Sequence, residues 1–186
     1  MVEFDQFTCA DAQAVDCLLD QAFGPQRQLK TSQRLRDGRA PADGLAIVAK
    51  SGGKLVASIS FWHVEAGGVP ALLLGPVAVD CALQGQGIGR ALIVYGLSRA
   101  ASFGHRAVIL VGDAPYYNRF GFSRALTSNL ILPGPVEYER FLGLELVPGA
   151  LASAAGLVVP TGAAASPMMP PLAPFAYPAE QIVAYA

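Results

Sequence analysis

A glycine-rich segment between a predicted strand and a predicted helix constrains this chain more than any other feature. The segment reads Gln84-Gly85-Gln86-Gly87-Ile88-Gly89-Arg90 and follows the apolar run Val77-Ala78-Val79. The first turn of a helix leaves about four backbone N–H groups without a helical acceptor, and the helix dipole places roughly half a positive charge there. Glycines let this backbone approach a bulky anion without Cβ collisions. The segment therefore predicts a strand–loop–helix unit whose loop binds a phosphate group.

The same glycines also fit other interpretations. A dinucleotide fingerprint G-x-G-x-x-G needs glycine at position 90 or 92, where Arg90 and Leu92 stand. A P-loop needs a Gly-Lys-Ser/Thr ending, which this segment lacks. Both signatures are excluded, while a plain tight turn that packs a helix closely on a strand remains an alternative.

Hydrophobic periodicity predicts an α/β mixture along residues 8–147. Helices are expected at about 8–23, 26–37, 87–103 and 114–120, and strands at about 45–49, 55–62, 71–79, 107–111 and 141–147. The Gly52-Gly53 turn joins the first two strands into a predicted hairpin, and Thr8 with Asp11 has capping-box-like spacing. Gly75-Pro76 lies inside the third strand. Since proline cannot donate to a ladder and glycine often marks a bulge, free backbone groups are expected there.

Composition restricts the partners and the compartment. Charged residues make up 15% of the chain and the net charge is -1, so no basic field favours nucleic acid or an anionic membrane. The three cysteines show no CxxC spacing or neighbouring histidine, so no metal site is expected. Without a visible signal peptide or an apolar run of about 18 residues, the chain is expected to be cytoplasmic.

The composition changes at Gly149, after which alanine, proline and glycine dominate and Glu180 is the only charged side chain. We therefore divide the chain into a domain at 1–148 and an arm or tail at 149–186. Frequent prolines predict neither a helix nor a long strand in the second part. It could lie extended on the domain, be partly disordered, or serve as a lid or dimer arm.

Two motifs resemble those of the GNAT superfamily of N-acetyltransferases. Gln84, Gly87 and Gly89 occupy the defining places of its acetyl-CoA signature, Arg/Gln-x-x-Gly-x-Gly/Ala. The later segment Tyr116-Tyr117-Asn118-Arg119-Phe120-Gly121-Phe122 resembles its aromatic-Tyr-x-Lys/Arg-x-Gly-Phe motif, in the spelling of a bacterial subgroup of predicted acetyltransferases. The resemblance covers roughly residues 3–147 in element order and is specific across 71–122.

This resemblance implies the GNAT fold, a central mixed twisted sheet with a bulged, splayed fourth strand and about four flanking helices. It implies acetyl-CoA as cofactor and a set of residues around it, which comprises Val77, Ala78, Val79, Gln84, Gly85, Gln86, Gly87, Ile88, Gly89, Arg90 and Asn118. The implied activity is acetyl transfer to a primary amine by direct attack, with oxyanion stabilisation near Val77 to Val79. A non-catalytic acyl-CoA-binding module and a dimerisation scaffold are the alternatives.

The matching catalytic residue is Tyr117, whose phenol can share a proton with the leaving CoA thiolate. Tyr116 could instead serve this role, and Asn118 could bind pantetheine or cap locally. No base is assigned, although His63, Glu65 and Asp80 lie near strand ends.

The acceptor side is less specified by the sequence. Four basic residues, Arg27, Lys30, Arg34 and Arg36, could attract a carboxylate-bearing acceptor, but a charge run on a helix is usually its solvated face, which we favour. Phe61 and Trp62 could line an apolar acceptor pocket, and a core position is the preferred expectation. The chain is expected to be a monomer or a homodimer.

Overall fold

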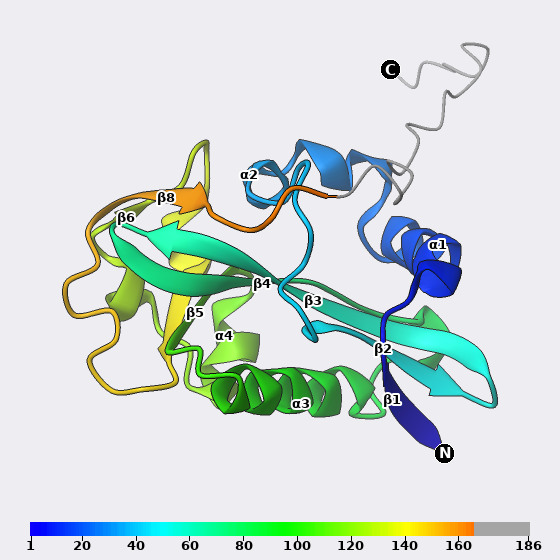
Figure 1. The fold of residues 1–186 in the computed structure, drawn as a ribbon. Helices are drawn as coiled ribbons and strands as arrows, with labels where there is room; N and C mark the ends of the chain where they lie inside the picture. The colour runs from blue at the N-terminus through cyan, green and yellow to red at the C-terminus, as the bar shows by residue number, and fades with distance from the viewer. Residues whose placement is uncertain (166–186) are drawn as a thin grey trace, which may run out of the picture.

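The computed structural model describes residues 1–165 and alternates helix and strand much as the periodicity predicts (Figure 1). The α-helices are α1 (Ala12–Phe23), α2 (Thr31–Arg34), α3 (Ile88–Ser102) and α4 (Ala114–Tyr117). The strands are β1 (Val2–Gln6), β2 (Ala46–Ser51), β3 (Lys54–Ala66), β4 (Val69–Val79), β5 (Ala107–Val111), β6 (Leu130–Ile131), β7 (Phe141–Glu145) and β8 (Gly156–Pro160). Six short 3-10 helices connect them: η1 (Cys9–Asp11), η2 (Pro25–Leu29), η3 (Cys81–Leu83), η4 (Asn118–Phe120), η5 (Arg124–Thr127) and η6 (Tyr138–Arg140).

The main sheet has the order β1-β2-β3-β4-β5-β7. Neighbours along it are antiparallel except β4 and β5, which run parallel, so the mixed sheet is as predicted. β8 pairs with the end of β3, and β6 pairs with β8. The parallel contact follows from the α3 crossover, because parallel neighbours need a long connection.

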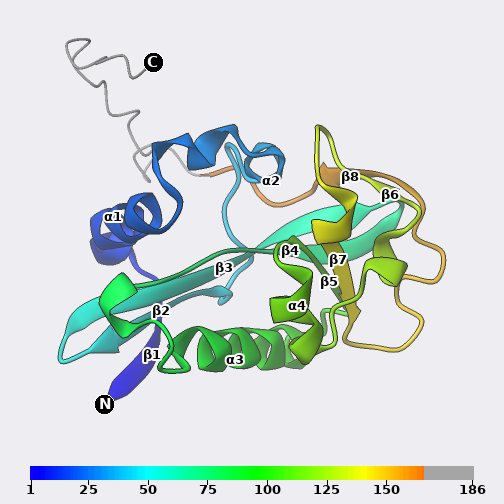
Figure 2. The ribbon, with the colours of Figure 1, turned by 180° about the vertical axis from the view of Figure 1, so that it is seen from behind.

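Helices cover both faces of this sheet. α3 and α4 lie on one face, and α1 and α2 lie on the other (Figures 1 and 2). Leu92 and Ile93 of α3 are fully buried in one core cluster with Ile59 and Phe61 of β3, which confirms the expected core position of Phe61. None of the helices within residues 1–165 is both long and apolar enough to cross a membrane.

β4 contains an irregularity, and beyond it the sheet opens between β4 and β5. Ile59 pairs with Val77, whereas the next pair is Phe61 with Leu74, so β4 holds one extra residue around Gly75-Pro76. This confirms the predicted bulge. The ladder between β4 and β5 consists of two pairs, at Leu72 and Leu73. Beyond them the two strands separate, as expected for the splayed fourth strand.

The N-terminal part differs from the prediction in two ways. β1 was not predicted, because the alternation of apolar and polar residues in Val2-Glu3-Phe4-Asp5 is too short to identify a strand, and its ladder with β2 provides the stabilisation. The helix predicted at 26–37 is wrong as one helix: η2 and α2 are separated by Lys30, whose backbone is extended. Tertiary contacts decide this break, since the Thr31 hydroxyl donates to the Pro135 carbonyl at 2.5 Å.

Residues 149–165 form part of the folded unit, which therefore continues past residue 148. Leu151, Ala154 and Val158 are buried in the core under β3 and β7, and β8 was not predicted from the proline-rich composition. The rest of the predicted arm, residues 166–186, lies outside the described part of the chain, so the lid and dimer-arm interpretations of 149–186 stay predictions.

Candidate active site

Three adjoining cavities follow the opening between β4 and β5. The loop cavity, about 560 Å³, lies between the end of β4, the glycine segment and α4. The splay cavity, about 240 Å³, is lined in part by 73–77 of β4 and by 111–113, where β5 ends. The helix-side cavity, about 520 Å³, lies between the α1–α2 region and the facing side of β2 and β3. The splay cavity shares the lining residue Pro76 with the helix-side cavity, and it shares Val77 and Tyr117 with the loop cavity.

The loop cavity collects most of the predicted cofactor residues. Nine of them line it: Val77, Ala78, Val79, Gln84, Gly85, Gly87, Ile88, Gly89 and Arg90. Gln86 and Asn118 do not line it. The Asn118 amide lies 3.0 Å from the carbonyl oxygens of Ala114 and Phe122 when its nitrogen faces them, which closes the turn after α4.

The glycine loop has the geometry of an anion site. Gly87 is the N-cap of α3 and adopts a left-handed conformation with φ of 83°, which glycine reaches without steric cost. The N–H groups of Ile88, Gly89 and Arg90 begin the helix, so no helical carbonyl accepts from them. The Gln84 amide donates to the Val79 carbonyl at 3.3 Å and ties the loop to β4. A phosphate group at this point would meet both free N–H donors and the positive end of the helix dipole.

The separated part of β4 supplies further donors. Successive N–H groups of a strand point to opposite sides, so alternate N–H groups between Leu74 and Val79 face the opening and have no ladder with β5. Trp62 holds the bulge next to them, because its indole N–H donates to the Gly75 carbonyl at 2.6 Å. Trp62 is half-buried and also lines the helix-side cavity. The prediction that it lies in the core therefore describes only part of its surroundings.

Tyr117 lies where the loop cavity and the splay cavity meet, since it lines both. Asp113 positions it as the N-cap of α4, where Oδ2 accepts from the Tyr116 N–H at 3.1 Å. The Tyr117 ring packs on Gly112 so closely that a methyl group at position 112 would collide with it. Burial, with smaller contributions from Tyr116 and Asp113, raises the pKa of Tyr117 to about 12. Its hydroxyl is therefore protonated at neutral pH and available as a donor.

The other candidates for acid–base roles lie elsewhere. Tyr116 lines only the loop cavity among the three, and the Arg119 guanidinium stacks on its ring at 4.8 Å. His63 packs against His105, with ring centroids 5.3 Å apart, and Glu65 is exposed.

Asp80 caps η3 by accepting from the Ala82 N–H at 3.0 Å. Like His63 and Glu65, it lines none of the three cavities. Within residues 1–165, no group of three or more His, Cys, Asp or Glu side chains is arranged to hold a metal ion.

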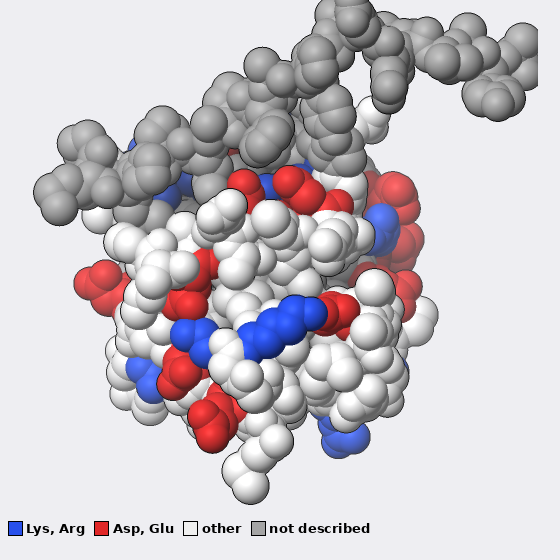
Figure 3. All heavy atoms as spheres, turned by 90° about the vertical axis from the view of Figure 1, so that its right-hand side faces the viewer, with Lys and Arg blue, Asp and Glu red and all other residues white. Residues whose placement is uncertain are grey.

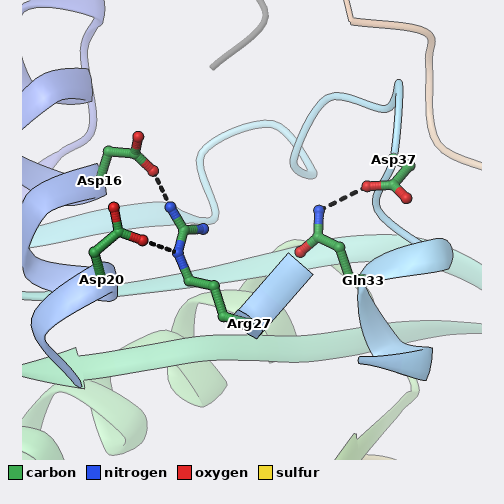
Figure 4. A network of polar contacts seen from close by, with 5 residues as sticks. All are labelled: Asp16, Asp20, Arg27, Gln33 and Asp37. Carbon is green, nitrogen blue, oxygen red and sulfur yellow. Dashed lines mark hydrogen bonds and ion pairs between the residues drawn. The ribbon is translucent and has the colours of Figure 1, made fainter. Parts of the chain in front are cut away.

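The basic residues before the sheet are not all a solvated face. Arg27 is 9% exposed and forms ion pairs with Asp16 and Asp20 of α1 (Figure 4). Arg36 is half-buried and, like Arg27, lines both the splay cavity and the helix-side cavity. The prediction of a solvated helix face is therefore wrong for these two residues, because Arg27 lies on η2 and Arg36 in the turn after α2, and both line the cavities beside the sheet.

The outer surface carries charges of both signs. On the face that Figure 3 shows, Lys and Arg side chains lie beside Asp and Glu side chains rather than gathering into one field. Basic side chains gather instead around the splay cavity, which is lined by Arg27, Lys30, Arg36 and Arg140.

Comparison with known proteins agrees with this architecture. The model of the Acetyltransferase (GNAT) family matches residues 12–122. YhbS of Escherichia coli K12, an uncharacterized N-acetyltransferase, is 32% identical over 150 residues, covering 80% of this chain and 89% of YhbS. The crystal structure of Escherichia coli YhbS in complex with CoA has a TM-score of 0.71 at 30% identity, covering 87% of this chain and 89% of that one. A GNAT family acetyltransferase from Brucella melitensis in complex with acetyl-CoA has a TM-score of 0.63 at 31% identity, covering 80% and 90%. This chain belongs to the GNAT acetyltransferase family.

Proposed function

We propose that this protein transfers the acetyl group of acetyl-CoA to a primary amine by direct attack of the amine on the thioester. The observation that carries the proposal is the place of Tyr117, which lines both the cavity at the glycine loop and the cavity at the splay. A cofactor bound at the loop would extend its thioester into the opening, next to this hydroxyl. The CoA and acetyl-CoA complexes of the two relatives support the choice of cofactor.

The cofactor would be held mainly by backbone groups. The pyrophosphate would accept from the N–H groups of Gln86 to Arg90, and the pantetheine arm would pair with free groups of Val77 to Val79. Asn118 would act indirectly, by holding the turn that follows Tyr117. The Tyr-Tyr-x-Arg-Phe-Gly-Phe sequence at 116–122 supports a place within the bacterial subgroup that shares this spelling.

The chemical step then uses donors that are already in position. The amine nitrogen attacks the carbonyl carbon and negative charge develops on the carbonyl oxygen, where an N–H group of Val77 to Val79 would stabilise it. As the intermediate collapses, the C–S bond breaks, the Tyr117 hydroxyl donates a hydrogen bond to the departing thiolate, and the nitrogen loses its second proton to solvent, which leaves a neutral amide. The ammonium proton of the acceptor is lost to solvent in the open cavity before attack.

Two measurements test this function. Acetyl-CoA at about 100 times its dissociation constant should stabilise the fold by roughly 2.7 kcal/mol, which a thermal shift detects. Release of CoA with a panel of primary amines then tests turnover. Absence of a thermal shift would contradict the proposal, whereas a shift without turnover on any amine would favour a non-catalytic acyl-CoA-binding module.

A further inference from the structure

The splay cavity and the helix-side cavity share part of their walls. Arg27, Gln33, Arg36 and Pro76 line both. Much of the rest of the helix-side cavity is apolar, including Leu19, Val48 and Trp62. A molecule with an apolar body in the helix-side cavity could therefore place an amine in the splay cavity, beside Tyr117.

One guanidinium on this shared wall has no acidic partner. Arg27 is neutralised by Asp16 and Asp20, as Figure 4 shows. The Arg36 Nε donates a hydrogen bond to the Ser32 carbonyl at 3.1 Å. No carboxylate among residues 1–165 lies within ion-pair distance of its guanidinium. The next residue, Asp37, instead accepts from the Gln33 amide at 2.7 Å (Figure 4).

The surroundings of Arg36 make this charge costly. The net effect of burial, of the opposing Asp37 carboxylate and of the nearby Arg27 guanidinium is to lower the pKa of Arg36 to about 10, with burial as the largest cause. The group is still a cation at neutral pH. Arg36 is half-buried, so its charge is only partly removed from water, and an anion that enters the cavity would offset the part of the desolvation cost that remains.

We propose that the acceptor is an amine that also carries a carboxylate on an apolar body, and that the Arg36 guanidinium binds this carboxylate. The inference rests on the proposed acetyl transfer. A planar guanidinium matches the two oxygens of a carboxylate. On the wall that the two cavities share, Arg27 is already engaged by two aspartates, so one guanidinium remains there, which matches the single negative charge of a carboxylate. The phosphates of CoA are not the ligand, because Arg36 does not line the loop cavity.

The test compares matched pairs of product analogues, so that it does not depend on turnover. N-acetyl-L-phenylalanine, N-acetyl-L-leucine and N-acetyl-6-aminohexanoate are each titrated against the protein in the presence of CoA, beside the corresponding carboxamides. At least one carboxylate should bind about 10- to 100-fold more tightly than its carboxamide, as expected for a charge-assisted hydrogen bond.

Substitutions then assign this preference to one side chain. Arg36→Met should abolish the preference, and Arg36→Lys should retain part of it because the charge stays while the fork is lost. Arg34→Met is the matched control, since Arg34 lies on α2, is exposed, donates to the Pro133 carbonyl and lines none of the three cavities. It should preserve the wild-type preference.

The outcomes separate this inference from the proposed function. If no carboxylate is preferred by the wild-type protein, or if Arg36→Met keeps the preference, the inference is overturned. The acetyl-CoA thermal shift is measured on the same samples. Loss of that shift in the wild type would contradict the proposed function, whereas a normal shift without any carboxylate preference would overturn the inference alone.

Discussion

Tyr117 shows how one residue's surroundings select its chemistry. A CoA thiol with the ordinary thiol pKa of about 8.5 is a stronger acid than a phenol whose pKa burial raises to about 12. Complete proton transfer from Tyr117 to the thiolate would therefore be uphill by about 5 kcal/mol, at 1.36 kcal/mol for each pKa unit. The hydroxyl is better suited to donate a hydrogen bond to the thiolate than to surrender its proton.

We expect Tyr117→Phe to lower kcat about 10- to 100-fold, the effect of removing one hydrogen bond to a charged group. The KM for acetyl-CoA should change little, because the phosphate and pantetheine contacts remain. Tyr116→Phe is the control, since Tyr116 does not line the splay cavity. Steady-state CoA release measures both variants, and equal kcat in Tyr117→Phe and wild type would remove Tyr117 from the mechanism.

The role of Trp62 could not be predicted from its own position in the sequence. Its indole N–H meets the carbonyl of Gly75, thirteen positions away, only because β3 and β4 form a hairpin whose register places them together. The sequence shows an aromatic residue in a predicted strand, which is compatible with a core position. It does not indicate that this side chain bonds to the backbone of the bulge.

At the scale of elements, the two ends of α3 offer a matched comparison. Gly87 precedes the helix and Gly104 follows it, both have φ of 83°, and neither would bring a new Cβ within 4 Å of another group. Alanine at either position should therefore cost a similar amount, about 1 to 2 kcal/mol, for the left-handed backbone.

Only Gly87→Ala should weaken acetyl-CoA binding, because only Gly87 lines the loop cavity. Calorimetric titration of acetyl-CoA against both variants provides the measurement, with chemical unfolding to compare their stabilities. If Gly104→Ala weakened binding as much as Gly87→Ala, general destabilisation rather than the loop geometry would explain the loss.

The start of α1 is held by a buried carboxylate. The Thr8 N–H donates to Asp11 Oδ2 at 2.9 Å, which confirms the predicted capping pair, and the Lys50 ammonium lies 2.9 Å from Oδ1. The Lys50 contact, together with the Thr8 hydrogen bonds, lowers the pKa of Asp11, while that of Lys50 is raised by Asp11. A lowered carboxyl pKa stabilises the fold above the unfolded value of 3.8, and this contribution is lost as the pH falls through the folded pKa. The raised pKa of Lys50 contributes below 10.5 and is lost as the pH rises above that value.

Asp11→Asn should therefore lower the free energy of unfolding by about 1 kcal/mol at pH 7, the usual effect of losing a cap. The difference from wild type should shrink as the pH falls below 3.8, since the wild-type carboxylate then becomes protonated. Urea unfolding at both pH values checks this expectation. Asp43→Asn, at an exposed position without an ion pair among residues 1–165, should have little effect, and a pH-independent difference for Asp11→Asn would contradict the role of the charge.

For the whole molecule, β8 extends the sheet beyond the GNAT motifs. Neighbouring residues of this strand point in opposite directions: Val158 is fully buried, whereas Leu157 is 50% exposed. Val158→Ala should cost about 2 kcal/mol in the free energy of unfolding, from lost burial and the cavity left behind. Leu157→Ala should change it by less than about 0.5 kcal/mol. Chemical unfolding of both variants measures the contrast, and equal costs would mean that residues 156–160 do not pack as described.

The sequence by itself determined the mixed α/β order, the β2–β3 hairpin, the bulge at Gly75-Pro76 and the glycine-rich loop before α3, for which it predicts anion binding. These features depend on neighbouring residues, because turns, caps and helical periodicity act over a few positions. It also indicated the family, since two motifs occur in the order that GNAT proteins use.

The tertiary structure decided what depends on distant partners. β1 and β8 are strands because β2 and β3 offer them ladders, and the predicted helix at 26–37 is broken where Thr31 bonds to Pro135. Tertiary contacts also decide the surroundings of Arg27, which pairs with Asp16 and Asp20 of α1, and of Arg36, which lines two of the cavities. Local patterns cannot assign such pairs, since the free energy that selects them comes from contacts formed only when the chain is folded.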